Sequence, residues 1–556
     1  MKQYQDFNQN LEESIKKNWD LDALTDYEGS TYQYKDVARK IEKLHILFEG
    51  AGIVKGDKIA LCGRNSANWA VAFLATLSYG AVAVPILHEF KADQVHNIVN
   101  HSEAKLLFVG DVAWPMLNAD EMPGLEGIIY IPDYSLLVSR TERLTEARER
   151  LNELFGKKYP KYFRAEHVSY APADSETLAL INYTSGTTSN SKGVLLPYRA
   201  LWSNLEFARE ALGQHVHAGD HVISMLPMAH MYGMAFEFIF EIMTGCHVFF
   251  LTRIPSPQVV FKAFADVKPR IVISVPMIVE KIIRKAVMPK LKTLSMKLLL
   301  RLPVVNSKIY DRIREQLQIA FGGNMYEVII GGAAFNSEIE QFLHKIGFNF
   351  TVGYGATECA PIITYVDWHD FRLGCCGKAV PRMEIKINSE DPQHVVGEIL
   401  ARGTNTMLGY FKNPEATAAA LDNEGWYHTG DLGVIDEDGY LYIRGRCKNM
   451  LLGSNGQNIY PEEIEDKLNT LPYVSESIVI QKGDKLYGLV YPDYDLVKKD
   501  GLDENGLRAA MEQNRKDLNE MINSYEQLSG IKIKEEEFEK TPKRSIKRFL
   551  YENEEI

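Results

Sequence analysis

The chain has 556 residues, a formal net charge of −12, and 46% hydrophobic and 24% charged residues. This composition is that of a globular protein, and the length exceeds what one hydrophobic core usually organises, so we expect about two to four domains. The acidic balance argues against a nucleic-acid partner, because neutralising backbone phosphates requires a basic surface.

Near the N-terminus the chain is polar, and we find no apolar core of a signal peptide there. The first long apolar run extends from Trp69 to Leu87 and approaches the length of a membrane span only by including Gly80 and Pro85. Its second half is rich in small and β-branched residues. We therefore expect a buried helix that ends at Gly80 and is followed by a core strand.

Helical periodicity alternates with short apolar runs over roughly the first 400 residues. These runs read DKIALCG, AKLLFVG, GIIYIP, HVFFL, RIVISV and EVIIGG. Buried strands between helices are typical of α/β layers with mostly parallel sheets. After about Asp391 the segments GEILARG, GYLYIRGR and SESIVIQKGDKLYGLVYP alternate like antiparallel strands, and Leu507–Leu528 has the pattern of an amphipathic helix.

A basic stretch lies between Lys281 and Arg314, where ten lysines and arginines stand against one acidic residue, Asp311. One interpretation is a solvated helix with an apolar core face, and the other is a surface that contacts an anionic membrane or ligand. We favour the solvated helix and keep peripheral membrane contact as the alternative.

The segment TSGTTSNSKG, from Thr184 to Gly193, has almost no side-chain bulk and follows the strand-like run LALINYT. Its glycines allow backbone amides to converge, its hydroxyls add donors, and Lys192 supplies a point charge. A polyphosphate suits such a loop at the end of a strand. The pattern is not a Walker A loop, because no serine or threonine follows the lysine. A Ser/Gly-rich surface turn is the alternative interpretation.

Two later segments supply groups that complement this loop. GYGATECAP carries Glu358, and a carboxylate beside a phosphate loop is what Mg²⁺ requires. In the same segment Tyr354 stands between glycines, which leaves its ring open to a base. GWYHTGDLG holds Asp431 in a glycine-bounded turn, where a carboxylate can accept both hydroxyls of a ribose.

The chain resembles the adenylate-forming (AMP-binding) superfamily, which includes acyl-CoA synthetases, luciferases and peptide-synthetase adenylation domains. The resemblance covers nearly the whole chain, and the motifs stand in the family's order: GIVKGDKIALCGRNSANW, YTSGTTSNSKGV, LPMAHMYG, IIGGAAF, GYGATE, GEILARGTNTMLGYFKNPEAT, WYHTGDLG and GQNIYPEEIE. VPMIVEKI followed by FGGNMYEVIIGGAAF resembles the long-chain fatty acyl-CoA synthetase branch.

This resemblance implies an α/β fold with a large N-terminal domain, residues 1–446, of layered α/β subdomains plus a distorted β-barrel. A small mobile α+β C-terminal domain, residues 447–556, would follow. The implied activity uses ATP, Mg²⁺ and coenzyme A: the carboxylate of a long-chain fatty acid attacks the α-phosphate of ATP, and the thiol of coenzyme A then displaces AMP. Positioning and charge neutralisation carry most of such chemistry, so no catalytic triad is needed.

The resemblance also assigns roles to individual residues. The β- and γ-phosphates would be held by Thr184, Ser185, Gly186, Thr187, Thr188 and Lys192, the adenine by Gly332, Ala333, Ala334 and Tyr354, and the ribose by Asp431 and Arg446. Thr357 and Glu358 would place Mg²⁺ and the α-phosphate, with Thr184 as a further metal ligand. His230 would stand near the substrate carboxylate, and Lys448 matches the hinge on which the C-terminal domain rotates. A hydrogen-bonded core histidine and an ordinary loop residue are the alternatives for these last two.

The C-terminal stretch KTPKRSIKRFL departs from the family, because Ser545 stands where the family has its adenylation lysine. One positive charge on a transferring phosphoryl group contributes several kcal/mol. We predict that a shifted cation, Lys543, Arg544 or Lys547, takes this role, and we include Lys547 among the catalytic residues.

Several alternatives stay open at this point. The acid could instead be aromatic or of medium chain length, the acceptor could be a carrier protein, or the chain could be a non-catalytic acyl- or nucleotide-binding homologue, which Ser545 keeps in consideration. The six cysteines include no CxxC pair, which favours the cytoplasm, with contact at the inner membrane surface through 281–314 as the alternative. The oligomeric state is open, and a homodimer is one option.

Overall fold

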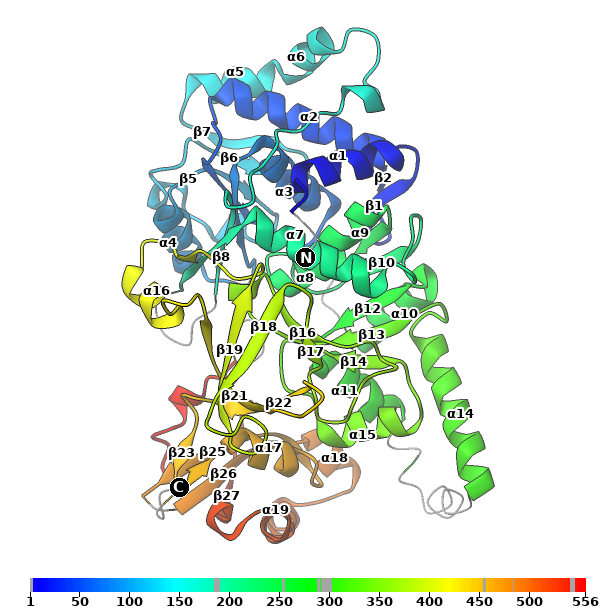
Figure 1. Cartoon of the computed structure of the whole chain (residues 1–556), viewed down its shortest axis with the longest axis vertical. Coiled ribbons are helices and arrows are strands. Elements are labelled where there is room, and N and C mark those ends of the chain that lie inside the picture. Colours follow the sequence, from blue (N-terminus) through cyan, green and yellow to red (C-terminus); the bar gives the residue numbers. More distant parts are fainter. Residues whose placement is uncertain are drawn as a thin grey trace.

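A computed structural model of the chain describes residues 4–184, 191–252, 256–287, 291, 303–453, 457–483, 485–540 and 546–556. The molecule is elongated, with the N-terminal α/β layers at one end and the residues after about 450 at the other (Figure 1). Helix α14 (Pro303–Ala320) projects from the side of the molecule (Figure 1).

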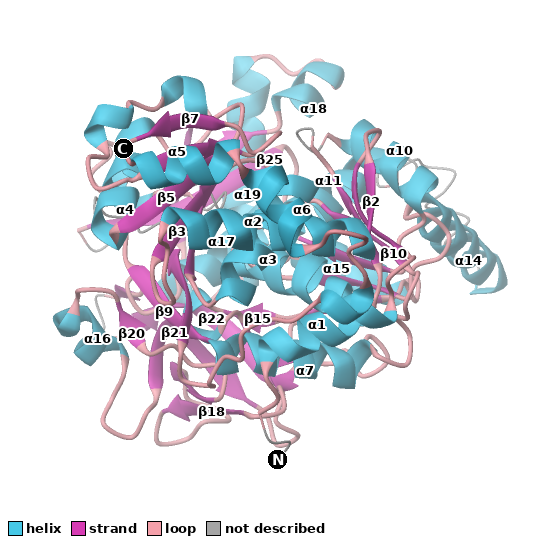
Figure 2. Ribbon diagram, turned by 90° about the horizontal axis from the view of Figure 1, so that it is seen from above, coloured by secondary structure: helices cyan, strands magenta, loops and turns pink. Residues whose placement is uncertain are grey.

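The largest sheet has eight strands in the order β20-β9-β8-β4-β3-β5-β6-β7. These strands are β3 (Lys58–Cys62), β4 (Val82–Ile86), β5 (Ala104–Val109), β6 (Gly127–Tyr130), β7 (Leu136–Ser139), β8 (Leu178–Tyr183), β9 (Gly193–Pro197) and β20 (Gly409–Tyr410). The central strands run parallel, whereas β7, β9 and β20 pair antiparallel with their neighbours. Helices α3 (Ala67–Tyr79), α4 (Ala92–Ser102) and α5 (Glu142–Glu149) contact strands of this sheet (Figure 2). Helix α2 (Tyr34–Ala51) packs on α3 and α5, and α1 (Phe7–Lys17) and α6 (Leu151–Lys158) contact α2.

Two smaller sheets continue the α/β layers. One has the order β10-β11-β1-β2 and the other β12-β13-β14, which is fully parallel. Their strands are β1 (Asp22–Asp26), β2 (Thr31–Gln33), β10 (His221–Ser224), β11 (His247–Phe250), β12 (Ile271–Ser274), β13 (Glu327–Ile330) and β14 (Phe350–Val352). The accompanying helices are α7 (Tyr198–Leu212), α8 (Met231–Met234), α9 (Phe240–Thr244), α10 (Pro257–Val267), α11 (Pro276–Ala286) and α15 (Ser337–Lys345).

The apolar run near residue 70 forms the predicted helix and strand. Helix α3 is capped by Gly80, whose φ of +86° is a left-handed conformation that glycine adopts without strain. Strand β4 follows, and all of its residues are buried. In the described part of the chain, no helix is both long enough and apolar enough to cross a membrane.

The later strands pair as two antiparallel sheets, β18-β19-β21-β22 and β15-β16-β17, in the region where the barrel was expected. Their bounds are β15 (Tyr354–Gly355), β16 (Ile362–Tyr365), β17 (Lys378–Ala379), β18 (Met383–Asn388), β19 (Gly397–Gly403), β21 (Tyr427–Ile435) and β22 (Leu441–Arg446), with α16 (Pro414–Ala420) nearby. The predicted strands before and after Asp391 are all confirmed, because each apolar or alternating run coincides with a strand.

The C-terminal region has its own hydrophobic core, which includes Ile464, Leu468 and Leu518. It comprises β23 (Leu451–Leu452), β24 (Asn458–Ile459), α17 (Pro461–Asn469), β25 (Val474–Lys482), β26 (Lys485–Pro492), α18 (Tyr494–Lys499), α19 (Glu504–Met521) and β27 (Leu528–Ile533). Helix α19 confirms the predicted amphipathic helix, which ends earlier than expected because the chain turns into β27. The predicted boundary at 446/447 lies between β22 and β23.

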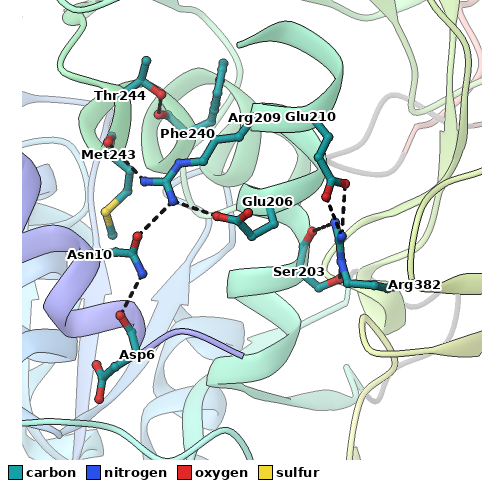
Figure 3. Close-up of polar contacts among 10 residues, drawn as sticks. All are labelled: Asp6, Asn10, Ser203, Glu206, Arg209, Glu210, Phe240, Met243, Thr244 and Arg382. Atoms are coloured by element: carbon teal, nitrogen blue, oxygen red, sulfur yellow. Dashed lines mark hydrogen bonds and ion pairs between the residues drawn. The ribbon is translucent and has the colours of Figure 1, made fainter. Parts of the chain in front are cut away.

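Helix α7 is held by two arginine networks (Figure 3). Arg209 of α7 donates to Asn10 Oδ1 of helix α1 at 2.9 Å. From the loop before β18, Arg382 donates to both carboxylate oxygens of Glu210 at 3.0 Å and to Ser203 Oγ at 3.1 Å. The Arg382 side chain is only 4% exposed. Since α7 begins directly after β9, these contacts fix the support on which the loop between β8 and β9 rests.

Candidate nucleotide and acid site

The loop predicted to hold phosphates connects two antiparallel strands at the end of the large sheet. Tyr183 of β8 lies opposite Gly193 of β9, and the Thr184 N–H donates to the Lys192 carbonyl at 3.0 Å. The two ends of the segment 184–192, hereafter the 184–192 loop, are therefore held together by the pairing of β8 with β9. A Cβ at Gly193 would lie 2.8 Å from Ile181, so a residue with a side chain would have to displace its neighbour. The predicted ligands Ser185, Gly186, Thr187 and Thr188 lie outside the described residues.

Glu358 and Lys192 are connected through Tyr410, by contacts that the sequence did not predict. Its carboxylate Oε1 accepts a hydrogen bond from the Tyr410 hydroxyl at 2.9 Å, and its carbonyl accepts from the Met407 N–H at 2.8 Å. Tyr410 belongs to β20, which pairs with β9 at the base of the loop. The Lys192 Nζ lies 4.9 Å from the centre of the Tyr410 ring. Tyr410 thus contacts a predicted phosphate ligand and a predicted metal ligand together.

Tyr354, Asp431 and Arg446 form a second connected group. The Tyr354 hydroxyl donates to Asp431 Oδ2 at 2.6 Å, and Arg446 Nε lies 2.7 Å from Asp431 Oδ1. Strand register explains the second contact, because Asp431 of β21 lies opposite Arg446 of β22. Burial raises the pKa of Tyr354 well above its usual value, and the nearby Asp431 adds to this, so the phenol stays protonated and donates. Burial also raises the pKa of Asp431, against the opposing effect of Arg446.

The predicted adenine loop follows β13. Gly332 has a φ of +87°, a left-handed conformation, and Gly332, Ala333 and Ala334 are exposed. The Gly353 N–H donates to the Ile330 carbonyl at 2.9 Å, which brings the strand that carries Tyr354 beside this loop. Exposed backbone between small side chains offers a flat surface for a planar base.

His230 ends the loop that follows β10 and begins α8. Its Nδ1 accepts from the Tyr232 N–H at 3.4 Å, a long hydrogen bond. A neutral ring with this acceptor carries its proton on Nε2, which then acts as a donor. The histidine is half-buried, as a residue that meets a substrate carboxylate would be.

Three polar residues that the sequence analysis did not single out hold the backbone of the His230 loop. Asn65 Oδ1 accepts from the Met228 N–H at 2.8 Å, and Asn182 Nδ2 donates to the Ala229 carbonyl at 3.0 Å. Glu237, which is fully buried, accepts from two backbone N–H groups of the same loop, at 2.8 and 3.0 Å. A signal for Glu237 was its position in the apolar run AFEFI, because a buried carboxyl group requires partners.

The predicted C-terminal residues are placed differently. Lys448 is exposed just after β22, beside Cys447, whose N–H donates to the Gly430 carbonyl at 2.9 Å. Lys547 pairs with Glu539, a contact within the C-terminal region. Lys543, Arg544 and Ser545 lie outside the described residues, so the identity of the shifted cation stays a prediction.

The residues at the 184–192 loop fit a magnesium ion that is shared with a triphosphate. Within the described ranges, no group of three His, Cys, Asp or Glu side chains could hold a metal ion. Glu358 is a single half-buried carboxylate whose second oxygen, Oε2, makes no hydrogen bond with another described residue. Magnesium accepts one or two carboxylates together with phosphate oxygens and water.

The basic stretch is described only in part. Arg284 of α11 donates to the Asn469 carbonyl of α17 at 3.4 Å, and Arg314 of α14 pairs with Asp311 at 2.9 Å. Residues 288–290 and 292–302 lie outside the described ranges. Membrane contact through 281–314 therefore stays a prediction.

Comparison with known proteins gives a consistent assignment. Residues 11–411 match the family of AMP-binding enzymes. The sequence is 28% identical over 475 residues to the long-chain-fatty-acid–CoA ligase FadD15 of Mycobacterium bovis, which covers 80% of this chain and 74% of that protein. It is 29% identical over 463 residues to the long-chain-fatty-acid–CoA ligase of Salmonella typhimurium, which covers 77% and 75%.

Solved structures of ligases have a similar fold. The anthranilate CoA ligase AuaEII in complex with anthranoyl-AMP has a TM-score of 0.77 and 20% identity, over 99% of this chain and 97% of that chain. ATP-bound MatB from Rhodopseudomonas palustris has a TM-score of 0.75 and 21% identity, over 99% of both chains. These likenesses confirm the predicted α/β fold with a large N-terminal and a smaller C-terminal domain. Since the family match extends over more than half of the sequence and includes the 184–192 loop, Glu358 and Tyr410, the chain belongs to the AMP-binding enzymes of the adenylate-forming superfamily.

Proposed function

We propose that this protein is an ATP- and Mg²⁺-dependent ligase that joins a long-chain fatty acid to coenzyme A through an acyl-adenylate. The observation that carries the proposal is the contact of both Lys192 and Glu358 with Tyr410, beside the 184–192 loop. A cation and a metal-binding carboxylate at this place suit a magnesium-bound triphosphate. The names of the relatives in Mycobacterium bovis and Salmonella typhimurium support the choice of acid and acceptor.

In the first half-reaction a carboxylate oxygen of the fatty acid attacks the α-phosphorus of ATP. The new bond joins acid and phosphorus, while the bond from the α-phosphorus to the bridging oxygen breaks and pyrophosphate leaves. Lys192 and the 184–192 loop bind the departing phosphates, and Tyr354 and Asp431 orient the nucleoside. His230 donates from Nε2 to the carboxylate and aligns it. Mg²⁺ held by Glu358 and Thr357, with Thr184 as a further ligand, would supply charge neutralisation at the phosphates.

In the second half-reaction the sulfur of coenzyme A attacks the acyl carbon. The bond from that carbon to the adenylate oxygen breaks, AMP leaves with this oxygen, and the thiol proton passes to water. We propose that the C-terminal domain rotates at Lys448 between the two half-reactions, so that a different segment of that domain faces the site in each. The loop that leads into GQNIYPEEIE would then face the acyl-adenylate.

The acid is tested by measuring AMP formation from ATP with coenzyme A and a panel of acids. The panel runs from octanoate to stearate and includes benzoate and anthranilate. We expect the highest kcat/KM for the long-chain acids. Activity with the aromatic acids alone would overturn the long-chain assignment. If none of the acids in the panel supports AMP formation, the ligase assignment is wrong. Hydroxylamine trapping without coenzyme A separates adenylate formation from thioester formation.

The shifted cation is tested by alanine substitution at Lys543, Arg544 and Lys547. We expect one of the three variants to lower acid-dependent pyrophosphate release by about tenfold or more. Lys534→Ala is a matched control, because it removes an ion pair with Glu554 in the same domain. If all three variants release pyrophosphate at the rate of the control, no shifted cation acts in adenylation.

A further inference from the structure

We infer that Tyr410 is a positioning residue that holds Glu358 with its hydroxyl and Lys192 with its ring, so that both charges are in place before the nucleotide binds. The inference rests on the proposed function and adds a residue to the site. Tyr410 touches neither the acid nor the reacting phosphorus in this scheme. It acts through the two charged groups.

The backbone of Tyr410 is fixed to the 184–192 loop. In strand β20, Gly409 lies opposite Leu195 and Tyr410 opposite Val194. The Phe411 N–H donates to the Gly193 carbonyl at 2.7 Å, one residue after Lys192. Because these hydrogen bonds begin directly after Lys192, Tyr410 and Lys192 are attached to the same pair of strands.

The segment between β19 and β20 adds further constraints. Arg199 of α7 donates to the carbonyls of Thr404 and Thr406 at 2.6 and 2.7 Å. Fully buried Asn405 donates to the Ile362 carbonyl at 2.8 Å. The Tyr410 N–H itself donates to Thr417 Oγ1 at 2.9 Å. A side chain on a backbone held at so many points can orient other groups without moving itself.

The hydroxyl of Tyr410 orients the Glu358 carboxylate. The phenol donates to Oε1 over 2.9 Å. A hydrogen bond to a charged acceptor is stronger than one between neutral groups. With Oε1 engaged in this hydrogen bond, Oε2 would be the oxygen that holds Mg²⁺.

The ring of Tyr410 makes a cation–π contact with the Lys192 ammonium. At 4.9 Å from the ring centre, Nζ lies within the range of a cation–π contact. Lys192 is exposed, and without the ring its flexible side chain would lose this restraint. Tyr410 is thus a shared partner of the ammonium and the carboxylate.

Two substitutions separate the two contacts. Tyr410→Phe removes the hydroxyl and keeps the ring, whereas Tyr410→Leu removes both. The matched control is Tyr440→Phe, because the Tyr440 hydroxyl donates to the Asp370 carbonyl at 3.0 Å and its ring lies under Arg372 and Lys378, at 3.9 and 4.4 Å. Tyr440 is as buried as Tyr410, and none of these contacts involves a predicted site residue.

Calorimetric binding of ATP, with and without Mg²⁺, gives a readout that is independent of turnover. In Tyr410→Phe we expect the Mg²⁺ concentration that half-saturates the ATP complex to rise about tenfold, with metal-free ATP binding unchanged. In Tyr410→Leu we expect metal-free ATP binding to weaken about three- to tenfold as well. The kcat of Tyr410→Phe should recover at saturating Mg²⁺, which loss of fold would not produce. Tyr440→Phe should match the wild type in both measurements.

Unchanged Mg²⁺ dependence in Tyr410→Phe would overturn the role of the hydroxyl, and unchanged metal-free binding in Tyr410→Leu would overturn the role of the ring. An equal loss in Tyr440→Phe would show a general effect on stability and would also overturn the inference. If the wild-type protein fails to bind ATP with Mg²⁺, the proposed function itself is wrong. The wild-type measurement therefore distinguishes the two failures.

Discussion

The surroundings of Tyr410 differ from the docking contact, by which we mean the polar contacts of α17 with the large domain. Around Tyr410 the hydrogen bonds measure 2.6 to 2.9 Å and involve buried or half-buried groups. In the docking contact, the Ser337 N–H donates to Asp466 at 3.3 Å, Arg284 donates to the Asn469 carbonyl at 3.4 Å, and Arg444 lies 3.6 Å from Glu463. The first region is built to stay in place, and the second can be released at little cost.

Acidic groups make the docking contact still weaker. Burial raises the pKa of Asp466, of Glu280 and of Glu340, and the charge of Asp466 adds to the effect on the other two. Each carboxylate is therefore less stable ionised here than in water. The proposed rotation of the C-terminal domain would be well served by a contact of this kind, whereas the phosphates need groups that do not move.

The largest effect is expected at Glu358, where the region around Tyr410 would meet the nucleotide. Glu358→Gln keeps the size of the side chain and removes its charge, so it should lower kcat/KM for ATP by about 10²–10³-fold, because charge stabilisation at phosphate is lost. Acid-dependent pyrophosphate release measures this change. The control is Glu176→Gln, which removes an exposed ion pair with Arg199. Equal activity of the two variants would contradict the role of Glu358.

The second largest effect is a loss of stability at Arg382, which contacts helix α7. Arg382→Ala removes a side chain that is 4% exposed and leaves the buried Ser203 Oγ without this donor, so it should lower the free energy of unfolding by about 2 kcal/mol. Arg372→Ala is the control, because its ion pairs with Asp436 and Asp438 are exposed and should contribute less than about 1 kcal/mol. Denaturant unfolding gives both values. A similar loss in both variants would remove the contrast between buried and exposed networks.

Protein stability should depend on pH through Glu340, whose carboxyl group is influenced by Asp466 of the docking contact. The pKa of Glu340 is raised from 4.5 to about 7 by burial. Native protein therefore binds this proton more tightly than unfolded protein does, and stability falls as pH rises from the unfolded value toward about 7. Glu340→Gln can still accept from the Gly374 N–H, and it should raise the free energy of unfolding by about 1–3 kcal/mol near pH 8. Near pH 5 the gain should be below about 1 kcal/mol. A gain independent of pH would contradict the assigned titration.

The smallest effect is expected from the docking contact itself. Asp466→Ala removes the long hydrogen bond to Ser337 and should change the free energy of unfolding by less than about 1 kcal/mol. The release of the C-terminal domain can be followed by distance measurements between labels on the two domains. If Asp466→Ala lowers the free energy of unfolding as much as Arg382→Ala does, the docking contact is as strong as the contacts of helix α7, and the contrast is wrong.

Much of the fold was predictable because its signals are local. Gly80 stops α3, the apolar runs form strands, and the loop at Thr184 follows a strand as its composition indicated. Glu358, Asp431 and Lys192 were singled out from residue chemistry, and in the structure they belong to two connected groups, while their catalytic roles stay predictions.

The rest of the site depends on pairing between distant segments. Tyr410 stood in a recognised motif, but its contact with Glu358, 52 residues earlier, exists only because β20 pairs with β9. Asn65 holds a backbone N–H 163 residues away, and no local pattern predicts such a contact. The contact of Lys547 with Glu539 likewise could not be read from a motif that the chain does not fully match.

The most direct test of the account follows an oxygen atom. The fatty acid is supplied with both carboxylate oxygens labelled by the heavy isotope, and the products formed with ATP, Mg²⁺ and coenzyme A are analysed by mass spectrometry. Attack on the α-phosphorus predicts one labelled oxygen in AMP and none in pyrophosphate. Label in pyrophosphate or inorganic phosphate, or unlabelled AMP formed in step with the thioester, would contradict the mechanism.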